Sequence, residues 1–225
     1  MKTSLLRPFV LLLAGLLSAA AAGAEGGPVL LVGDSLMKEV GRSAKRQLAK
    51  TGGEAVVESS IGSGLARLDL FDWPAKLKEK LAAKPAWVVL LIGANDDQDL
   101  DSPTGSVAYG TPAWSEVYAQ RVDAMLAAAK EAGAKVLWVG LPRMRDARSD
   151  AHATLVNGII KARIAAAGRG EFYDIAPVYA VGNKYSPFIL LPPNDQVLQV
   201  RGEDGIHFNR EGAEHLAGLI LGKLK

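Results

Sequence analysis

The chain has 225 residues, of which 49% are hydrophobic and 22% are charged, and it contains no cysteine. This length and this balance of residues are typical of a folded protein with one sizeable core, and they argue against disorder. Without cysteine, the chain cannot form disulfides, thiolate metal sites or a cysteine nucleophile. The formal net charge is +2, and its meaning depends on where the basic residues lie.

The first 24 residues have the features of a secretory signal peptide. Lys2 and Arg7 precede an apolar run over residues 8–17, and small residues follow as far as Ala24. A basic start, an apolar stretch of about 7–15 residues and a small-x-small cleavage site define such signals. The run is shorter than the roughly 20 apolar residues that a membrane span needs. We therefore expect cleavage after Ala24, a mature domain over residues 25–225, and export to the periplasm or out of the cell.

Removal of this signal changes the charge of the protein. The first 24 residues hold two of the 26 basic residues and none of the 24 acidic residues, so the mature domain carries no net charge. Nucleic-acid binding usually requires a clearly basic surface. We therefore expect no nucleic-acid partner, and no stable membrane span once the signal is removed.

Short apolar runs alternate with helical patterns along the mature chain. Runs rich in Val, Leu and Ile predict strands buried on both faces of a parallel sheet, at residues 29–32, 55–57, 87–92, 136–139 and 172–175. Apolar residues three or four apart predict helices with one buried face, as at Tyr118, Val122, Met125 and Ala129. Asp72-Trp73-Pro74 is typical of a helix start, with Asp72 as the cap and Pro74 in the first turn. The alternation predicts a three-layer α/β/α sandwich.

The segment from Tyr179 to Gly202 breaks this alternation. It contains three prolines and two glycines, which predict a long loop. Long ordered loops in compact domains are often functional. The side chains of Tyr179, Tyr185 and Phe188 either stack on a sugar or pack within the loop itself, and both interpretations stay open.

Residue types that carry hydrolytic chemistry follow the predicted strands. In an open parallel sheet, ligands bind outside the carboxyl ends of the strands. The short sequences at these ends are Gly33-Asp34-Ser35-Leu36, Ser60-Ile61-Gly62-Ser63-Gly64, Gly93-Ala94-Asn95-Asp96 and, after the long loop, Asp204-Gly205-Ile206-His207. Together they supply a hydroxyl, flexible glycines, an amide, a carboxylate and an imidazole at one edge of the sheet, as a hydrolase site requires.

Ser35 and His207 are the candidate catalytic pair. Ser35 lies at the predicted start of a helix, where the helix dipole stabilises negative charge. His207 follows Asp204 by three residues, so a single turn can hold the carboxylate against the imidazole. Each residue alone has a simpler explanation, because Asp34 and Ser35 also suit a helix cap and His207 also suits a surface position.

Asn95 and Gly64 are candidate donors to an oxyanion, through a side-chain amide and a backbone N–H. One such donor can be worth about 10²–10³ in rate. Both residues also suit ordinary turns or caps. His152 and His215 lack comparable neighbours, and no group of His, Asp or Glu has metal-ligand spacing. We therefore expect neither a metal nor a cofactor.

The four short sequences, in this order, resemble the four sequence blocks of the SGNH (GDSL-type) hydrolase family. Any one block is a weak signal, but the ordered set is specific and spans nearly the whole mature domain. Residues 64–67 and 71–74 further resemble an exported bacterial subgroup, the DUF459-type SGNH proteins. The resemblance implies a flavodoxin-like parallel sheet in the strand order 2-1-3-4-5.

The resemblance also implies roles for individual residues. It implies a triad with Ser35 as nucleophile, His207 as base and Asp204 as orienting acid. It implies an oxyanion hole formed by the N–H groups of Ser35 and Gly64 and the side chain of Asn95. In the second block, Gly62 is the alternative to Gly64 if the loop register differs by two. Gly64 is favoured because it follows a small residue, as the family's glycine usually does.

Residues and resemblance together predict a serine esterase that cleaves or transfers ester-linked acyl groups of a small molecule or glycan. Export and neutral charge favour O-acetyl groups on an envelope or extracellular polysaccharide. A lipolytic or aryl esterase, similar to a lysophospholipase or thioesterase, is the alternative enzyme, and a non-catalytic binding module is the third hypothesis. Arg143, Arg145 and Arg148 follow the fourth strand and either hold an anionic group or form a solvated basic face.

Overall fold

The computed structural model describes residues 27–224, so the predicted signal peptide lies outside the described residues. A five-stranded parallel sheet has the order β2-β1-β3-β4-β5. Its strands are β1 (Val29–Gly33), β2 (Ala55–Ser59), β3 (Trp87–Leu91), β4 (Lys135–Val139) and β5 (Glu171–Tyr173). The order and the strand positions confirm the predicted flavodoxin-like sheet.

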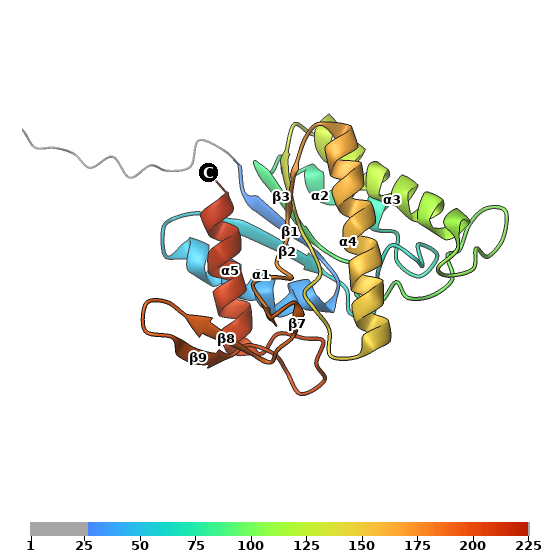
Figure 1. Cartoon of the computed structure of the whole chain (residues 1–225). Helices are drawn as coiled ribbons and strands as arrows, with labels where there is room; N and C mark the ends of the chain where they lie inside the picture. The colour runs from blue at the N-terminus through green and yellow to red at the C-terminus, as the bar shows by residue number, and fades with distance from the viewer. Residues whose placement is uncertain (1–26, 225) are drawn as a thin grey trace, which may run out of the picture.

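Helices cover both faces of this sheet (Figure 1). On one face, α1 (Ser35–Ala49) packs against α5 (Arg210–Lys223). The other face carries α2 (Trp73–Leu81), α3 (Pro112–Glu131) and α4 (Ala147–Ala167), with α3 in contact with both α2 and α4. The result is the predicted three-layer sandwich, in which a helix connects each strand of the parallel sheet to the next along the chain.

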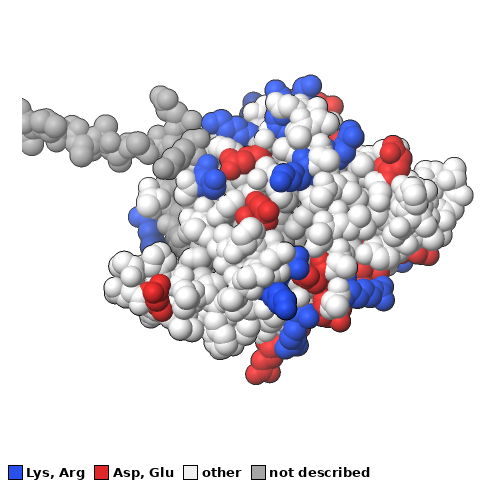
Figure 2. All heavy atoms as spheres, in the orientation of Figure 1, with Lys and Arg blue, Asp and Glu red and all other residues white. Residues whose placement is uncertain are grey.

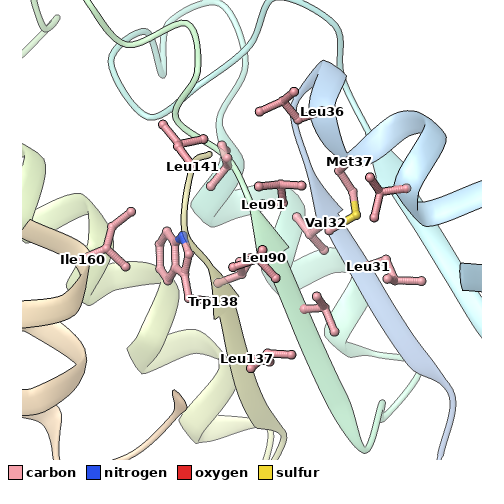
Figure 3. Close-up of a cluster of buried hydrophobic side chains, with 14 of the residues drawn as sticks. Leu31, Val32, Leu36, Met37, Leu90, Leu91, Leu137, Trp138, Leu141 and Ile160 are labelled. Atoms are coloured by element: carbon pink, nitrogen blue, oxygen red, sulfur yellow. The ribbon is translucent and has the colours of Figure 1, made fainter. Parts of the chain in front are cut away.

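The central strands are buried on both sides. All five residues of β1 are buried, and so is every residue of β3 and β4 after the first. Figure 3 shows their side chains packed between Met37 of α1 and Ile160 of α4. Uninterrupted apolar runs are the pattern of parallel strands covered by helices, and each large apolar side chain contributes about 1.5–3 kcal/mol on burial.

Aspartate side chains define where two helices begin. Asp72 Oδ1 accepts a hydrogen bond from the N–H of Ala75 at 2.9 Å, and Pro74 stands in the first turn, which confirms the predicted start of α2. Asp34 Oδ1 likewise accepts from the N–H of Leu36 at 2.9 Å and caps α1. A cap of this kind is typically worth about 1 kcal/mol. The second cap places Ser35 at the first position of α1, directly beyond the end of β1.

The segment between Tyr179 and Gly202 is more regular than predicted. Two antiparallel hairpins form in it, β6 (Ala180–Val181) with β7 (Lys184–Tyr185), and β8 (Phe188–Leu191) with β9 (Gln196–Gln199). The prediction of one long loop was therefore wrong in part. Strands of two to four residues are too short to show an alternating pattern. The turn residues Asn183 and Asp195 have positive φ, which Asn and Asp tolerate better than most residues.

The aromatic side chains of this segment have three different environments. Tyr179 is fully buried, with its ring centroid 4.8 Å from that of Phe208 and its hydroxyl 2.9 Å from Nδ1 of His215. The ring of Tyr185 lies 5.5 Å from the guanidinium carbon of Arg201. Phe188 remains 44% exposed. Tyr179 thus belongs to the core, and of the three residues only Phe188 is exposed.

None of the helices within residues 27–224 is both long enough and apolar enough to cross a membrane. In that same part of the chain, no three His, Asp or Glu side chains are grouped so that they could hold a metal ion. On the face that Figure 2 shows, basic and acidic side chains are interspersed.

Candidate active site

Three residues of the predicted site form a continuous hydrogen-bonded chain. Ser35 Oγ lies 2.7 Å from His207 Nε2, and His207 Nδ1 lies 2.6 Å from Asp204 Oδ2. Ser35 stands at the end of β1, whereas His207 is 172 residues further along the chain. The fold therefore brings the three predicted residues together. In such a chain the imidazole can take the serine proton while the carboxylate orients the ring.

The position of Ser35 follows from the strand-to-helix connection. Because Asp34 is the helix cap, Ser35 provides one of the first N–H groups of α1. These N–H groups have no partner within the helix, and the helix dipole adds partial positive charge beside them. The same residue can therefore supply a nucleophilic oxygen and a donor to a developing oxyanion.

Asp204 is held by three hydrogen-bond donors. Its Oδ2 faces His207 Nδ1, and its Oδ1 accepts from the N–H groups of Ile206 at 2.8 Å and His207 at 2.9 Å. Partial burial acts to raise the pKa of Asp204, but these hydrogen bonds outweigh it and lower the pKa to about 2. An ionised Asp204 carboxylate can hold a proton on Nδ1 of His207, and in that tautomer Nε2 can accept the proton of Ser35.

A cavity of about 290 Å³ opens beside Ser35. The other residues that line it are Leu36, Lys38, Glu39, Ile61, His207 and Phe208. Its volume is at the small end of the range for ligand pockets. A larger cavity of about 520 Å³ lies at the opposite edge of the sheet, where Trp87, Lys135 and Glu171 begin β3, β4 and β5. Chemistry, rather than volume, identifies the smaller cavity as the candidate site.

Two of the three predicted oxyanion donors, Gly64 and Asn95, lie in loops that contact each other. Asn95 Nδ2 donates to the carbonyl oxygen of Ser63 at 2.9 Å, which places the amide beside Gly64. The other N–H of this amide donates to no acceptor within residues 27–224. Gly64 packs so closely against Asp96 that a Cβ on Gly64 would lie 1.9 Å from Asp96 Oδ1. By contrast, Gly62 has a φ of +72° and open space around it, so the turn requires it for its backbone conformation.

Asp34 does more than cap a helix, and this second role was not predicted. Its Oδ2 accepts from the N–H groups of Gly93 at 2.9 Å and Ala94 at 3.0 Å, while Oδ1 holds the N–H of Leu36. One carboxylate therefore ties the start of α1, which carries Ser35, to the loop after β3. The prediction of a cap was correct but incomplete, because the bonds to the β3 loop cross 59 residues of sequence.

Asp96 was not predicted to support the site at all. Its Oδ2 accepts from the N–H of Leu65 and from the hydroxyl of Tyr118, both at 2.9 Å, and its Oδ1 accepts from the N–H of Ala66 at 2.8 Å. The carboxyl group is buried, and this burial raises its pKa despite the three donors. Asp96 thus ties the loop of Gly64 to the end of β3. The available signal was an aspartate four residues after the apolar run predicted as a strand at residues 87–92.

Two of the three arginines after β4 form ion pairs. Arg143 pairs with Asp150 at 2.8 Å, and Arg148 pairs with Asp97 at 3.1 Å. Arg145 packs against Gly205, whose carbonyl oxygen accepts from the Arg145 N–H at 3.3 Å. Of the three, Arg145 is therefore the one in contact with the turn that carries Asp204 and His207.

Residues 28–223 match the family described as "Protein of unknown function (DUF459)". The chain belongs to the DUF459 family. This confirms the resemblance that residues 64–67 and 71–74 indicate. None of the curated proteins is similar enough in sequence to match the chain.

Several solved structures have the same fold as this DUF459 protein. A GDSL-like lipase from Bacteroides thetaiotaomicron is 19% identical, with a TM-score of 0.59 over 88% of this chain and 87% of the other. A catalytic mutant of an acetylxylan esterase from Geobacillus stearothermophilus is 16% identical, with a TM-score of 0.59 over 88% and 94%. A carbohydrate esterase family 3 protein from Talaromyces cellulolyticus is 18% identical, with a TM-score of 0.57 over 88% and 96%. At these identities the comparison shows a shared fold, in agreement with the predicted SGNH type.

Burial of Asp34 predicts an unusual pH dependence of stability. Burial raises the pKa of Asp34 to about 6 from an ordinary 3.8, although its three N–H donors act to lower it. Between these two values the folded protein binds more protons than the unfolded chain, so stability increases as the pH falls. We expect the wild-type free energy of unfolding, relative to Asp34→Asn, to increase by roughly 1 kcal/mol from pH 7 to pH 5.

Urea unfolding of both proteins at the two pH values measures this difference. Asp195→Asn is the matched control, because Asp195 is an exposed turn residue, and its difference from wild type is expected to stay constant. If the difference in the free energy of unfolding between wild type and Asp34→Asn is the same at pH 7 and pH 5, the prediction is contradicted.

Proposed function

We propose that this protein is a serine ester hydrolase in which Ser35 is the nucleophile, His207 the general base and Asp204 the orienting acid. The observation that carries the proposal is the chain of hydrogen bonds of 2.7 Å and 2.6 Å that joins these three side chains. The solved structures with the same fold are named as a lipase and as esterases, and this supports ester hydrolysis as the reaction class.

The reaction begins with attack of Ser35 Oγ on the ester carbonyl carbon, while His207 Nε2 takes the serine proton. The N–H groups of Ser35 and Gly64 and the amide of Asn95 stabilise the oxyanion of the tetrahedral intermediate. The intermediate collapses to an acyl-serine as His207 returns the proton to the departing alcohol. Water then attacks the acyl-serine with the same assistance and releases the acid, and a sugar hydroxyl in place of water gives acyl transfer.

For the substrate, we propose O-acetyl groups on an envelope or extracellular polysaccharide. The cavity of about 290 Å³ at Ser35 suits a small acyl group better than a long chain. Two of the structures with this fold are named as an acetylxylan esterase and a carbohydrate esterase. The signal peptide proposed for residues 1–24 places the enzyme in the periplasm or outside the cell, where such polymers occur.

A panel of esters with different acyl groups tests this substrate class. We expect kcat/KM for p-nitrophenyl acetate to exceed that for the octanoate by roughly tenfold or more, because the longer chain must extend out of the cavity. We also expect acetate release from acetylated oligosaccharides, with Ser35→Ala as the background. A preference for octanoate or for lysophospholipids indicates the lipolytic alternative instead.

Labelling with a fluorophosphonate probe separates an enzyme from a binding module. We expect wild type to be labelled at Ser35 and His207→Ala to remain unlabelled, because the probe needs an activated serine. A wild-type protein that binds acetylated glycans but takes up no label is a binding module that has kept the fold.

A further inference from the structure

Arg201 is a fully buried arginine in the segment between β9 and the turn of Asp204 and His207. It forms no ion pair within the described part of the chain, where its Nε and Nη1 also have no hydrogen-bond partner. Its guanidinium carbon lies 4.9 Å from the centre of the Phe208 ring and 5.5 Å from that of the Tyr185 ring. Burying an unpaired guanidinium is costly. A residue that carries this cost has a role beyond filling space.

The guanidinium contacts the backbone of the turn that carries two members of the proposed triad. Arg201 Nη2 lies 2.7 Å from the carbonyl oxygen of Ile206 and 3.3 Å from that of Gly205. Two backbone hydrogen bonds also close this turn. The N–H of Gly202 donates to the carbonyl oxygen of His207 at 2.8 Å, and the N–H of Gly205 donates to the carbonyl oxygen of Gly202 at 3.1 Å. The turn is thus enclosed between its own backbone and one buried cation.

Arg201 and Asp204 hold the same two peptide groups from opposite sides. The carbonyls that Arg201 contacts belong to the peptide bonds Gly205–Ile206 and Ile206–His207. The N–H groups of these two peptide bonds are the ones that donate to Asp204 Oδ1, at 2.8 Å and 2.9 Å. A positive charge at the carbonyl and a negative charge at the N–H of one amide strengthen each other through its dipole. Two peptide groups therefore connect the cation to the carboxylate.

We propose that Arg201 is the positioning residue of the triad, which fixes the two peptide groups that hold Asp204 and thereby directs Oδ2 of Asp204 at His207. This inference rests on the proposed function, because it assumes that Asp204 and His207 act in catalysis. If the two peptide groups rotate, Asp204 loses both backbone donors and keeps only its bond to His207. The imidazole then loses its fixed orientation toward Ser35.

The test replaces Arg201 with methionine, which fills the space between the two rings without a charge or a donor. We expect kcat to fall roughly tenfold or more, with KM nearly unchanged, because the lost contact orients the base and does not touch the substrate. Circular dichroism of each variant gives the folded fraction by which kcat is corrected. Arg163→Met is the matched control, since Arg163 pairs with Asp123 between α3 and α4 and its loss should leave kcat unchanged.

A spectroscopic signal distinguishes positioning from general destabilisation. The proton between His207 Nδ1 and Asp204 should give a far-downfield NMR resonance, identified by its absence in His207→Ala. We expect this resonance to shift or disappear in Arg201→Met and to persist in Arg163→Met. A folded Arg201→Met protein with wild-type kcat and an unchanged resonance overturns the inference.

Arg201→Lys keeps the inference testable if the methionine variant does not fold. Lysine retains a cationic donor but lacks the planar fork, so we expect a kcat between those of wild type and Arg201→Met and a shifted resonance. If only the lysine variant folds, a wild-type kcat together with an unshifted resonance in that variant overturns the inference. Absence of labelling in the wild-type protein contradicts the proposed function instead, so the two failures are distinguishable.

Discussion

Replacing Ser35 with alanine is expected to lower kcat for ester hydrolysis by about 10⁶-fold, and adding His207→Ala to that variant is expected to cost nothing further. The reason is the 2.7 Å contact between Ser35 Oγ and His207 Nε2, through which the two side chains act as one unit. Once the nucleophile is absent, the base has no proton to remove. The single His207→Ala variant should lose a similar factor, and Asp204→Asn should lose less, about 10⁴-fold.

Steady-state hydrolysis of the acetyl reporter by the two single variants and the double variant measures this non-additivity. The hydroxyl of Ser35 makes its side-chain hydrogen bond to His207, so the alanine variant should fold with an unchanged Tm. Ser106→Ala, at an exposed serine, is the matched control and should keep wild-type turnover. Losses that multiply in the double variant would mean that Ser35 and His207 act in separate steps.

The strands of the main sheet could be predicted because their signal is local. A strand covered by helices on both faces needs apolar residues at every position, and such runs are visible without knowledge of the partners. The edge strand β5 is shorter than predicted and ends at Tyr173, although Ile175 beyond it is buried. Burial therefore continues past the hydrogen-bonded strand, which an apolar run alone does not reveal.

The buried charges could not be predicted, because their burial depends on partners far along the chain. Asp34 looks like an ordinary cap until the fold brings the N–H groups of Gly93 and Ala94 to its second oxygen. In the sequence, Arg201 resembles any surface arginine near the end of a long loop. Its contacts depend on a turn whose shape is not encoded in the hydrophobic pattern.

The candidate site repeats one structural arrangement, which the hydrophobic pattern of the sequence does not reveal. Two of the proposed functional residues at strand ends have a buried aspartate as a neighbour in sequence, Asp34 before Ser35 and Asp96 after Asn95. Both carboxylates accept hydrogen bonds from backbone N–H groups of another loop. The loops are therefore fixed to one another by charged hydrogen bonds beneath the site, which favours a preorganised oxyanion hole.

Gly64→Ala is expected to lower kcat by about 10²–10³-fold, the effect of removing one oxyanion donor. An added Cβ would lie 1.9 Å from Asp96 Oδ1, and Asp96 is itself held by Leu65, Ala66 and Tyr118. Because the carboxylate cannot easily move, the backbone at residue 64 must shift and carry its N–H away from the oxyanion. Overpacking of this kind should also lower the free energy of unfolding by about 1–3 kcal/mol.

Gly62→Ala is the matched control, because it lowers stability and leaves the contact between residue 64 and Asp96 unchanged. Nothing lies within 4 Å of a Cβ at Gly62, but its φ of +72° costs an alanine about 1–2 kcal/mol. The two variants should thus be destabilised to a similar extent, and only Gly64→Ala should lose activity beyond a fewfold. Steady-state kcat and urea unfolding of both variants test this prediction. A larger loss of kcat in Gly62→Ala would assign the donor to Gly62, and wild-type kcat in a folded Gly64→Ala would remove residue 64 from the oxyanion hole.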